Sequence, residues 1–457
     1  MFVPTTEKER QEMLRKIGVG SFDELVGSIP EKARNPAYRL PKALTEMELA
    51  RHMEALGAQN RLPLSFLGGG AQEHYIPAAV WAVALRGEFA TAYTPYQAEA
   101  SQGTLQLIYE FQSMVCRLLE MEVANASHYD GASALAEAVN VALLDFDGRN
   151  PGRRGAVKKV IFPETLHPHY RATLKTYFHQ RADVRLECLP CPDGTLAPSV
   201  LAGYVDDSTA AVAASCPNFF GLLEPAGELC RAAHARGALF IACVDPVGMG
   251  ILEPPGSYGA DLAVAEGIGL GIPPSFGGPS LGLVAAKRSL LRKMPGRFCG
   301  LTADRDGRRG YVLTLQAREQ HIRREKSSSN VCTNQALCAT AATIHMALLG
   351  PEGLREAAEL CYGLSHELAS ALADIPGFRL KFGGASFYNE FVLQCPQDAS
   401  QAQKFLLKDD ILAGYPLGAD YPWLKDCLLV CATETKTRAD LRRLAEAARK
   451  LPVAAAR

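Results

Sequence analysis

The sequence predicts an α/β fold in which helices cover both faces of a mostly parallel sheet. Its 457 residues are 48% apolar, which is enough to bury a large core. Short, mainly apolar runs of strand length recur through the middle of the chain, at residues 159–162, 184–189, 210–215, 239–244 and 263–265. Helical segments lie between several of them, at residues 169–179 and 227–236. Strands and helices that alternate at this spacing predict parallel strands joined by crossover helices.

The N-terminal region predicts a short helical arm. Between residues 5 and 34, apolar side chains recur at helical spacing, and Gly18, Gly20 and Pro30 interrupt the pattern. The apolar positions are Met13, Leu14, Ile17, Phe22, Leu25 and Ile29. We therefore place a helical arm at residues 1–60, followed by a large α/β domain at residues 61–330.

A smaller α/β domain is expected at residues 331–457. Gly350, Pro351 and Gly353 should separate its first two helices, because proline and glycine disfavour a helix interior. Helical patterns cover residues 334–349, 352–372, 401–407 and 438–451, and apolar runs predict strands at residues 391–395 and 427–432.

Charge and cysteine usage narrow the class of function. The 48 basic and 49 acidic residues leave a formal net charge of −1, so no basic excess attracts nucleic acid or an anionic membrane. No apolar stretch reaches the roughly 18 residues of a membrane helix, and residues 1–10 lack the pattern of a targeting segment, so we expect a cytoplasmic protein. The thirteen cysteines do not show the spacing of a disulfide framework, so we expect most of them to be reduced core residues. Cys188 and Cys191 form a CxxC-like pair, but no further zinc ligands lie near them in the sequence.

Residues 125–137 form a candidate anion site. Ser127 and Ser133 surround Gly131, ahead of a run of helix formers. A turn of this kind at a helix N-terminus can bind an anion, because backbone N–H groups and the helix dipole point outward. The alternative is an ordinary capped helix.

Residues 91–103 predict a cleft or a subunit interface. Tyr93, Thr94 and Gln97 lie close together beside Pro95. This mixture is too polar and too aromatic for a simple core element.

Two further segments carry single candidate residues. The glycines at 68–70 permit close backbone approach before His74, which is either a structural hydrogen-bond donor or an acid–base group. Arg324 lies in the charged and hydroxyl-rich residues 318–330, where it could clamp a carboxylate with two hydrogen bonds or belong to a solvated face.

Four blocks of this chain carry a resemblance to a known family. The blocks are residues 66–80 (FLGGGAQEHYIPAAV), 91–103 (TAYTPYQAEASQG), 125–137 (NASHYDGASALAE) and 318–337 (REQHIRREKSSSNVCTNQAL). They resemble the P-protein (decarboxylating glycine dehydrogenase) of the glycine cleavage system. The likeness extends over essentially the whole chain and is to subunit 1, the α subunit of forms in which the P-protein is split into two related subunits. The resemblance implies the large fold of PLP-dependent transferases, fold type I.

The turn in which catalytic P-proteins carry the PLP lysine has no lysine here. The resemblance places that lysine in a strand-turn-strand after a Gly-Ala-Asp element, which this chain keeps at residues 259–261, but the turn reads EGIGLG at residues 266–271. Only a primary amine forms the covalent link to PLP, so this chain should not tether the cofactor. Lys287 follows the second strand and should begin a surface helix.

Two other positions resemble parts of a PLP site in degenerate form. Ser133 would correspond to the phosphate cup and Asp245 to the acid that pairs with the pyridine nitrogen. Asp245 is followed by Pro246 and Val247, whereas catalytic chains have Gly-Ala there.

The resemblance implies a non-tethering α subunit of glycine dehydrogenase (decarboxylating) that is inactive alone. Its homologous β subunit would hold PLP covalently. The complex would bind glycine, release CO2 and transfer the aminomethyl group to the lipoyl arm of H-protein, alongside the T- and L-proteins. His74, Tyr93, Thr94, Gln97 and Arg324 are then candidates for positions near the cleft of an αβ or α2β2 assembly.

Two alternative functions stay open at this point. An independent PLP-dependent lyase or aminotransferase would use Lys287 or another lysine of this chain. A scaffold that binds H-protein would tolerate changes in residues 91–103 without loss of turnover.

Overall fold

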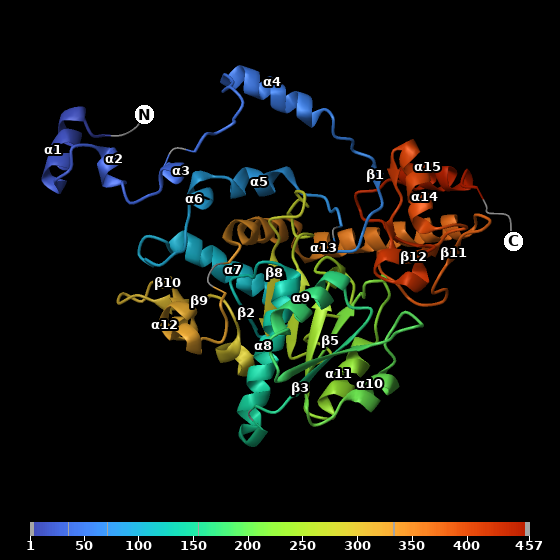
Figure 1. The fold of residues 1–457 in the computed structure, drawn as a ribbon. Coiled ribbons are helices and arrows are strands. Elements are labelled where there is room, and N and C mark those ends of the chain that lie inside the picture. The colour runs from blue at the N-terminus through green and yellow to red at the C-terminus, as the bar shows by residue number, and fades with distance from the viewer. Residues whose placement is uncertain (1–3, 35, 71, 154, 332–333, 453–457) are drawn as a thin grey trace. The chain divides into compact units, whose positions relative to one another are not determined.

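The computed structural model describes residues 4–34, 36–70, 72–153, 155–331 and 334–452 (Figure 1). The chain divides into two units, Met1–Leu62 and Pro63–Arg457. Residue 71 of the first matched block and residues 332 and 333 of the fourth lie outside the described residues.

The N-terminal unit is helical. Capping boxes begin the two longer helices, with Thr6 paired to Glu9 and Thr45 paired to Glu48. The first helix ends at Gly18, whose φ of 90° is left-handed, as its glycine predicts. The helices are α1 (Glu7–Ile17), α2 (Phe22–Leu25), α3 (Glu31–Arg34) and α4 (Glu46–Gly57).

A seven-stranded sheet forms the centre of the second unit. Five adjacent strands run parallel in the order β7, β6, β5, β3 and β4. Beyond β7, β8 pairs antiparallel with β7, and β2 pairs antiparallel with β8. This confirms the predicted mostly parallel sheet. The strands are β2 (Val123–Ala124), β3 (Lys158–Pro163), β4 (Val184–Leu189), β5 (Thr209–Cys216), β6 (Leu239–Val244), β7 (Leu262–Glu266) and β8 (Gly282–Ala286).

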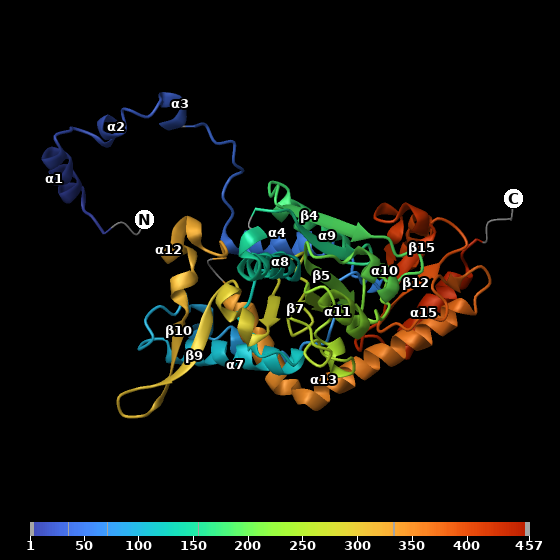
Figure 2. The same ribbon diagram turned by 90° about the horizontal axis from the view of Figure 1, so that it is seen from below.

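Helices cover both faces of this sheet (Figure 2). Neighbouring strand residues point to opposite faces, so Val160 packs in one apolar cluster and Ile161 in the other. One face carries α8 (Gly131–Arg149) and α9 (Pro168–Phe178). The other carries α7 (Gln102–Leu119), α10 (Pro198–Tyr204), α11 (Ala226–His234) and the start of α13 (Ala336–Ala373).

A smaller antiparallel sheet follows α13 in the chain. The helix kinks at Gly350, where φ is 62° and ψ is −176°, so the predicted break before Pro351 is present. The sheet order is β11 (Arg379–Leu380), β12 (Glu390–Gln394), β15 (Cys427–Cys431) and β14 (Tyr415–Pro416). Side chains of α13, α14 (Ala399–Leu406) and α15 (Arg438–Arg449) complete its core.

Some elements were not expected from the sequence. The hairpin of β9 (Phe298–Ala303) and β10 (Arg309–Thr314) is one, and the pairing of β1 (Leu64–Ser65) with β13 (Ile411–Leu412) is another. Within the described ranges, every helix is too short or too polar to cross a bilayer.

Candidate functional site

A cavity of about 110 Å³ lies at the carboxyl ends of the parallel strands. Loops that leave neighbouring strands converge there, so residues distant in sequence become neighbours. His167 follows β3, Asn218 follows β5 and Asp245 follows β6, while Glu266 ends β7. Glu390 at the start of β12 adds a residue from the smaller sheet.

The carboxylate of Glu266 closes one end of this cavity. Its Oε2 accepts a hydrogen bond of 3.0 Å from the backbone N–H of Gly131, the first residue of α8, and its Oε1 accepts one of 3.1 Å from the N–H of Leu281. The N-terminus of a helix favours an anion, because its N–H groups lack partners within the helix and carry positive partial charge. Glu266 therefore supplies the negative group that this end of α8 attracts.

A second carboxylate occupies the same helix N-terminus. Asp130 is the N-cap of α8 and its Oδ1 accepts from the N–H of Ser133 at 2.8 Å. The Ser133 hydroxyl lies 3.0 Å from Asp130 Oδ2 and 3.0 Å from His128 Nδ1. Two carboxylates of this chain thus lie at the helix N-terminus where the anion site was expected.

Three further polar side chains of the cavity bond to the backbone. The Oδ1 atom of Asp245 accepts from the N–H of Val247 at 2.8 Å, and Glu390 Oε1 accepts from the N–H of Gly69 at 2.6 Å. His167 Nε2 lies 2.7 Å from the Gly69 carbonyl, while its Nδ1 accepts from the N–H of His169. These two bonds fix the neutral tautomer of His167 that carries its proton on Nε2.

The electrostatic character of the cavity is acidic. Asp245, Glu266 and Glu390 line it, and no lysine or arginine does so among the described residues. Burial is the main cause that raises the pKa of Glu266 and that of Glu390, each to about 7. Near pH 7 each of these two carboxyl groups is therefore partly protonated and partly ionised.

Replacing Glu390 with glutamine is expected to stabilise the protein increasingly as the pH rises. The carboxyl has a pKa of 4.5 when exposed and about 7 when folded, so its stabilising contribution is complete below the first value and is lost as the pH passes the second. The shift corresponds to about 3 kcal/mol. Urea unfolding of both proteins at about pH 5 and about pH 8 should show the stability difference growing by up to that amount. An unchanged difference would contradict the raised pKa.

Among the described residues, no lysine lines the cavity to bind PLP covalently. A Cβ added to Gly269, in the turn after β7, would lie 3.0 Å from Val247 Cγ2 and 3.1 Å from His74 Cδ2, so both neighbours would have to give by a few tenths of an ångström. A phosphate group would meet the two carboxylates that already occupy the start of α8. Like charges repel in such a buried site.

Lys287 is engaged elsewhere. It lies after β8, and its Nζ donates to Gly259 O at 2.9 Å and to Asp261 Oδ1 at 2.6 Å. Gly259 and Asp261 both come just before the first residue of β7, whereas Glu266 is the last residue of that strand. Lys287 therefore lies at the opposite end of β7 from the cavity.

The structure brings together two of the residues singled out from the sequence. His74 and Asp245 both line the cavity. Tyr93 and Thr94 line a separate hollow of about 180 Å³ against α7 and α13, and Gln97 and Arg324 are exposed. These four residues do not line the cavity.

The cysteines, including the pair Cys188 and Cys191, can be compared with what the sequence predicts. Cys188 is exposed and Cys191 is buried with its thiol 3.7 Å from Leu189 O, and the pair belongs to no cluster of three or more metal-binding side chains within the described ranges. The described cysteines form no disulfide.

Sequence reasoning missed several cavity residues. His167 follows a predicted strand directly, and that position could have marked it, because the carboxyl ends of parallel strands meet at one edge. No sequence pattern marks Glu390 or Asn389 as site residues, because they reach the cavity only through the packing of the smaller sheet.

Comparisons with known proteins agree on one family. A family model described as glycine cleavage system P-protein matches residues 1–447. A curated relative from Thermomicrobium roseum, described as a probable glycine dehydrogenase (decarboxylating) subunit 1, is 46% identical over 454 residues, covering 98% of this chain and 99% of the relative. A second, from Desulfitobacterium hafniense and described in the same words, is 47% identical over 97% of this chain and 98% of its own.

Solved structures show the same relationship. A crystal structure of glycine decarboxylase (P-protein) of the glycine cleavage system, in inhibitor-bound form, superposes with a TM-score of 0.89 at 41% identity, covering 98% of this chain and 99% of that one. A C-DES mutant with glycine covalently linked to the PLP cofactor superposes with a TM-score of 0.61 at 14% identity, over 87% and 98% of the two chains, and shows a likeness of fold alone. The predicted fold of PLP-dependent transferases, fold type I, is confirmed.

Proposed function

Because the chain belongs to the glycine cleavage system P-protein family, we propose that it is the α subunit of a two-subunit glycine dehydrogenase (decarboxylating) and does not itself tether PLP. A homologous β subunit holds the cofactor through its own lysine. The complex decarboxylates glycine and passes the aminomethyl group to the lipoyl arm of H-protein.

One observation carries this proposal. Glu266 occupies the N-terminus of α8 from within the turn where a tethering lysine would be needed. The same residue thus takes the place at the helix N-terminus where an anion would bind, and among the described residues no lysine lines the cavity. The relatives named as subunit 1 support the same assignment, because that name implies a second subunit.

The role left to this chain is to complete the complex. The candidates Tyr93, Thr94, Gln97 and Arg324 do not line the acidic cavity, and Tyr93 is 81% exposed. Large exposed aromatic side chains are enriched at protein interfaces. We place residues 91–103 against the β subunit, near its cleft.

Reconstitution tests the proposed function. The purified chain alone should release no CO2 from glycine, and activity should appear when the β subunit and H-protein are added.

The Tyr93→Ala variant tests the proposed interface. The substitution should weaken the affinity of this chain for the β subunit by about tenfold or more. It should change the free energy of unfolding of this chain by less than about 0.5 kcal/mol, because the Tyr93 side chain is exposed.

A matched control makes the reconstitution specific. Tyr204 is 42% exposed at the end of α10, away from residues 91–103 in sequence, and Tyr204→Ala should leave the affinity unchanged. Glycine decarboxylation by this chain alone would refute the proposal. Full affinity in Tyr93→Ala would move the interface elsewhere and favour the scaffold alternative.

A further inference from the structure

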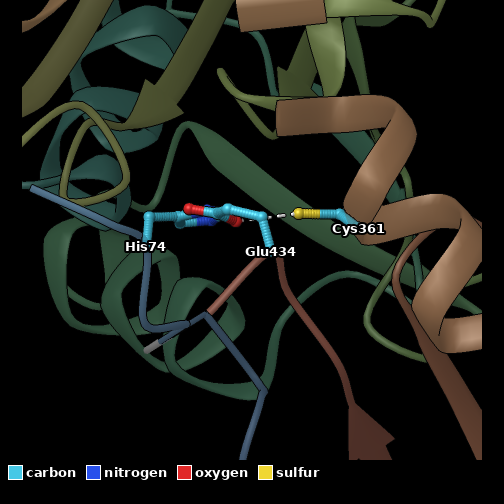
Figure 3. A group of neighbouring side chains, drawn as sticks. All are labelled: His74, Cys361 and Glu434. Carbon is cyan, nitrogen blue, oxygen red and sulfur yellow. Dashed lines mark hydrogen bonds and ion pairs between the residues drawn. The ribbon is translucent and has the colours of Figure 1, made fainter. Parts of the chain in front are cut away.

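Three potential metal-binding side chains meet beside the acidic cavity (Figure 3). His74 precedes α5 (Ala78–Ala84), Cys361 lies in α13 and Glu434 follows β15. Their ligand atoms all lie within 4.8 Å of one another. Residues from three distant parts of the chain therefore present nitrogen, sulfur and oxygen to one point.

The three groups are held closely in the observed arrangement. Glu434 Oε2 lies 2.9 Å from His74 Nδ1 and 3.1 Å from Cys361 Sγ, and Glu434 Oε1 accepts from the Tyr75 N–H at 2.7 Å. The His74 and Glu434 side chains are 6% and 12% exposed, and Cys361 is fully buried. Such burial excludes most competing water ligands.

The spacing is close to that of a metal centre. Zinc bonds of about 2.0–2.3 Å to these donors place tetrahedral ligand atoms about 3.3–3.7 Å apart. The two separations to Glu434 Oε2, 2.9 and 3.1 Å, would need to open by a few tenths of an ångström, and the third, between His74 and Cys361, lies within 4.8 Å. Imidazole, thiolate and carboxylate together are a donor set that suits Zn²⁺.

A second observation points to a ligand at this place. His345 lies in α13, is 2% exposed and lines a cavity of about 270 Å³ together with His74 and Glu434. Neither of its ring nitrogens makes a hydrogen bond of good geometry within the described residues, and the Tyr75 backbone is the polar group near enough to act on its pKa. Buried polar nitrogens are rarely left without a partner.

We propose that His74, Cys361 and Glu434 bind a divalent transition metal of the zinc class, with the fourth coordination position facing the cavity that His345 lines. Binding displaces the proton of the Cys361 thiol, and His74 coordinates through Nδ1 as a neutral imidazole that keeps a proton on Nε2. Each ion therefore releases two protons where His74 starts as an imidazolium and one where it starts neutral. The ion joins the segment before α5, α13 and the turn after β15 and stabilises their arrangement.

Cobalt titration of the EDTA-treated full chain, alone and in complex with its β subunit, tests this proposal. Co²⁺ should bind at one equivalent and produce the near-ultraviolet absorption of a cobalt–thiolate bond, and Zn²⁺ should displace it with a Kd below about 1 μM. Cys361→Ser should lose this absorption and bind Zn²⁺ about a hundredfold or more weakly. The readout needs no glycine turnover, so it is independent of the proposed function.

The double variant Cys188→Ser, Cys191→Ser is the control, because it removes an exposed and a buried thiol that lie in no metal-binding cluster of the described residues. It should keep the absorption and the stoichiometry. Loss of the signal in this control but not in Cys361→Ser would overturn the proposal. The absence of any cobalt–thiolate absorption in the parent protein would also overturn it, leaving the three side chains as a hydrogen-bonded group, and this outcome holds even if Cys361→Ser does not fold.

Discussion

Replacing Gly221 with alanine is expected to cost more than about 4 kcal/mol of the free energy of unfolding. Gly221 has a φ of 79°, in the left-handed region. Its added Cβ would lie 2.0 Å from the Glu390 carbonyl oxygen and 2.4 Å from the carbonyl carbon, and a backbone group cannot rotate aside. The loop after β5 would have to separate from β12, which would break the packing of the smaller sheet onto the large one.

Gly384→Ala separates the two causes of this effect. Gly384 has a φ of 89°, yet a Cβ there would meet no atom within 4 Å. Gly384→Ala should therefore lower the free energy of unfolding only by the cost of a left-handed backbone at alanine, about 1–2 kcal/mol. Urea unfolding should give the Gly221 variant at least twice the loss of the Gly384 variant, or no cooperative transition. Equal losses would show that the close approach to Glu390 is absent.

Replacing Glu434 with alanine is expected to destabilise the protein by about 3 kcal/mol or more. Burial alone would raise the pKa of Glu434, but the hydrogen bond and charge of His74 lower it to about 2. Burial alone would lower the pKa of His74, but the hydrogen bond to Glu434 and the charge of that carboxylate raise it instead. The variant leaves His74 charged or unpaired in a buried site and frees the Tyr75 N–H.

A surface ion pair supplies the comparison. Glu367 pairs with Arg438 at 3.0 Å, with side chains 45% and 74% exposed. Glu367→Ala should change the free energy of unfolding by no more than about 1 kcal/mol, because water screens exposed pairs. Denaturant unfolding near neutral pH measures both variants. Similar losses in the two would mean that the His74–Glu434 pair is not buried as described.

The sequence could predict the elements more readily than the site. The alternation of apolar runs and helical patterns is local, so the parallel strands and the break at Gly350 followed from residues within a few turns of each other. The hairpin of β9 and β10 escaped because its strands alternate less clearly and pack half-exposed. A distant residue also contacts it, since the Gln102 side chain bonds both the N–H and the carbonyl of Tyr311 in β10.

The site depends on contacts that no local pattern contains. Glu266 and Gly131 are 135 residues apart, and His74 and Glu434 are 360 apart. The absence of lysine from the turn after β7 was visible in the sequence, whereas the contact of the Glu266 carboxylate with the start of α8 was not. Only the packing of α8 against β7 brings Glu266 to the helix N-terminus.

Borohydride reduction of the assembled complex tests the central claim most directly. This reagent fixes PLP to the lysine that holds it, and peptide mapping then identifies that lysine. We expect every labelled peptide to come from the β subunit and none from this chain, in which Lys287 donates to Gly259 and Asp261 instead. A PLP-labelled peptide from this chain, at Lys287 or at any other lysine, would contradict the account.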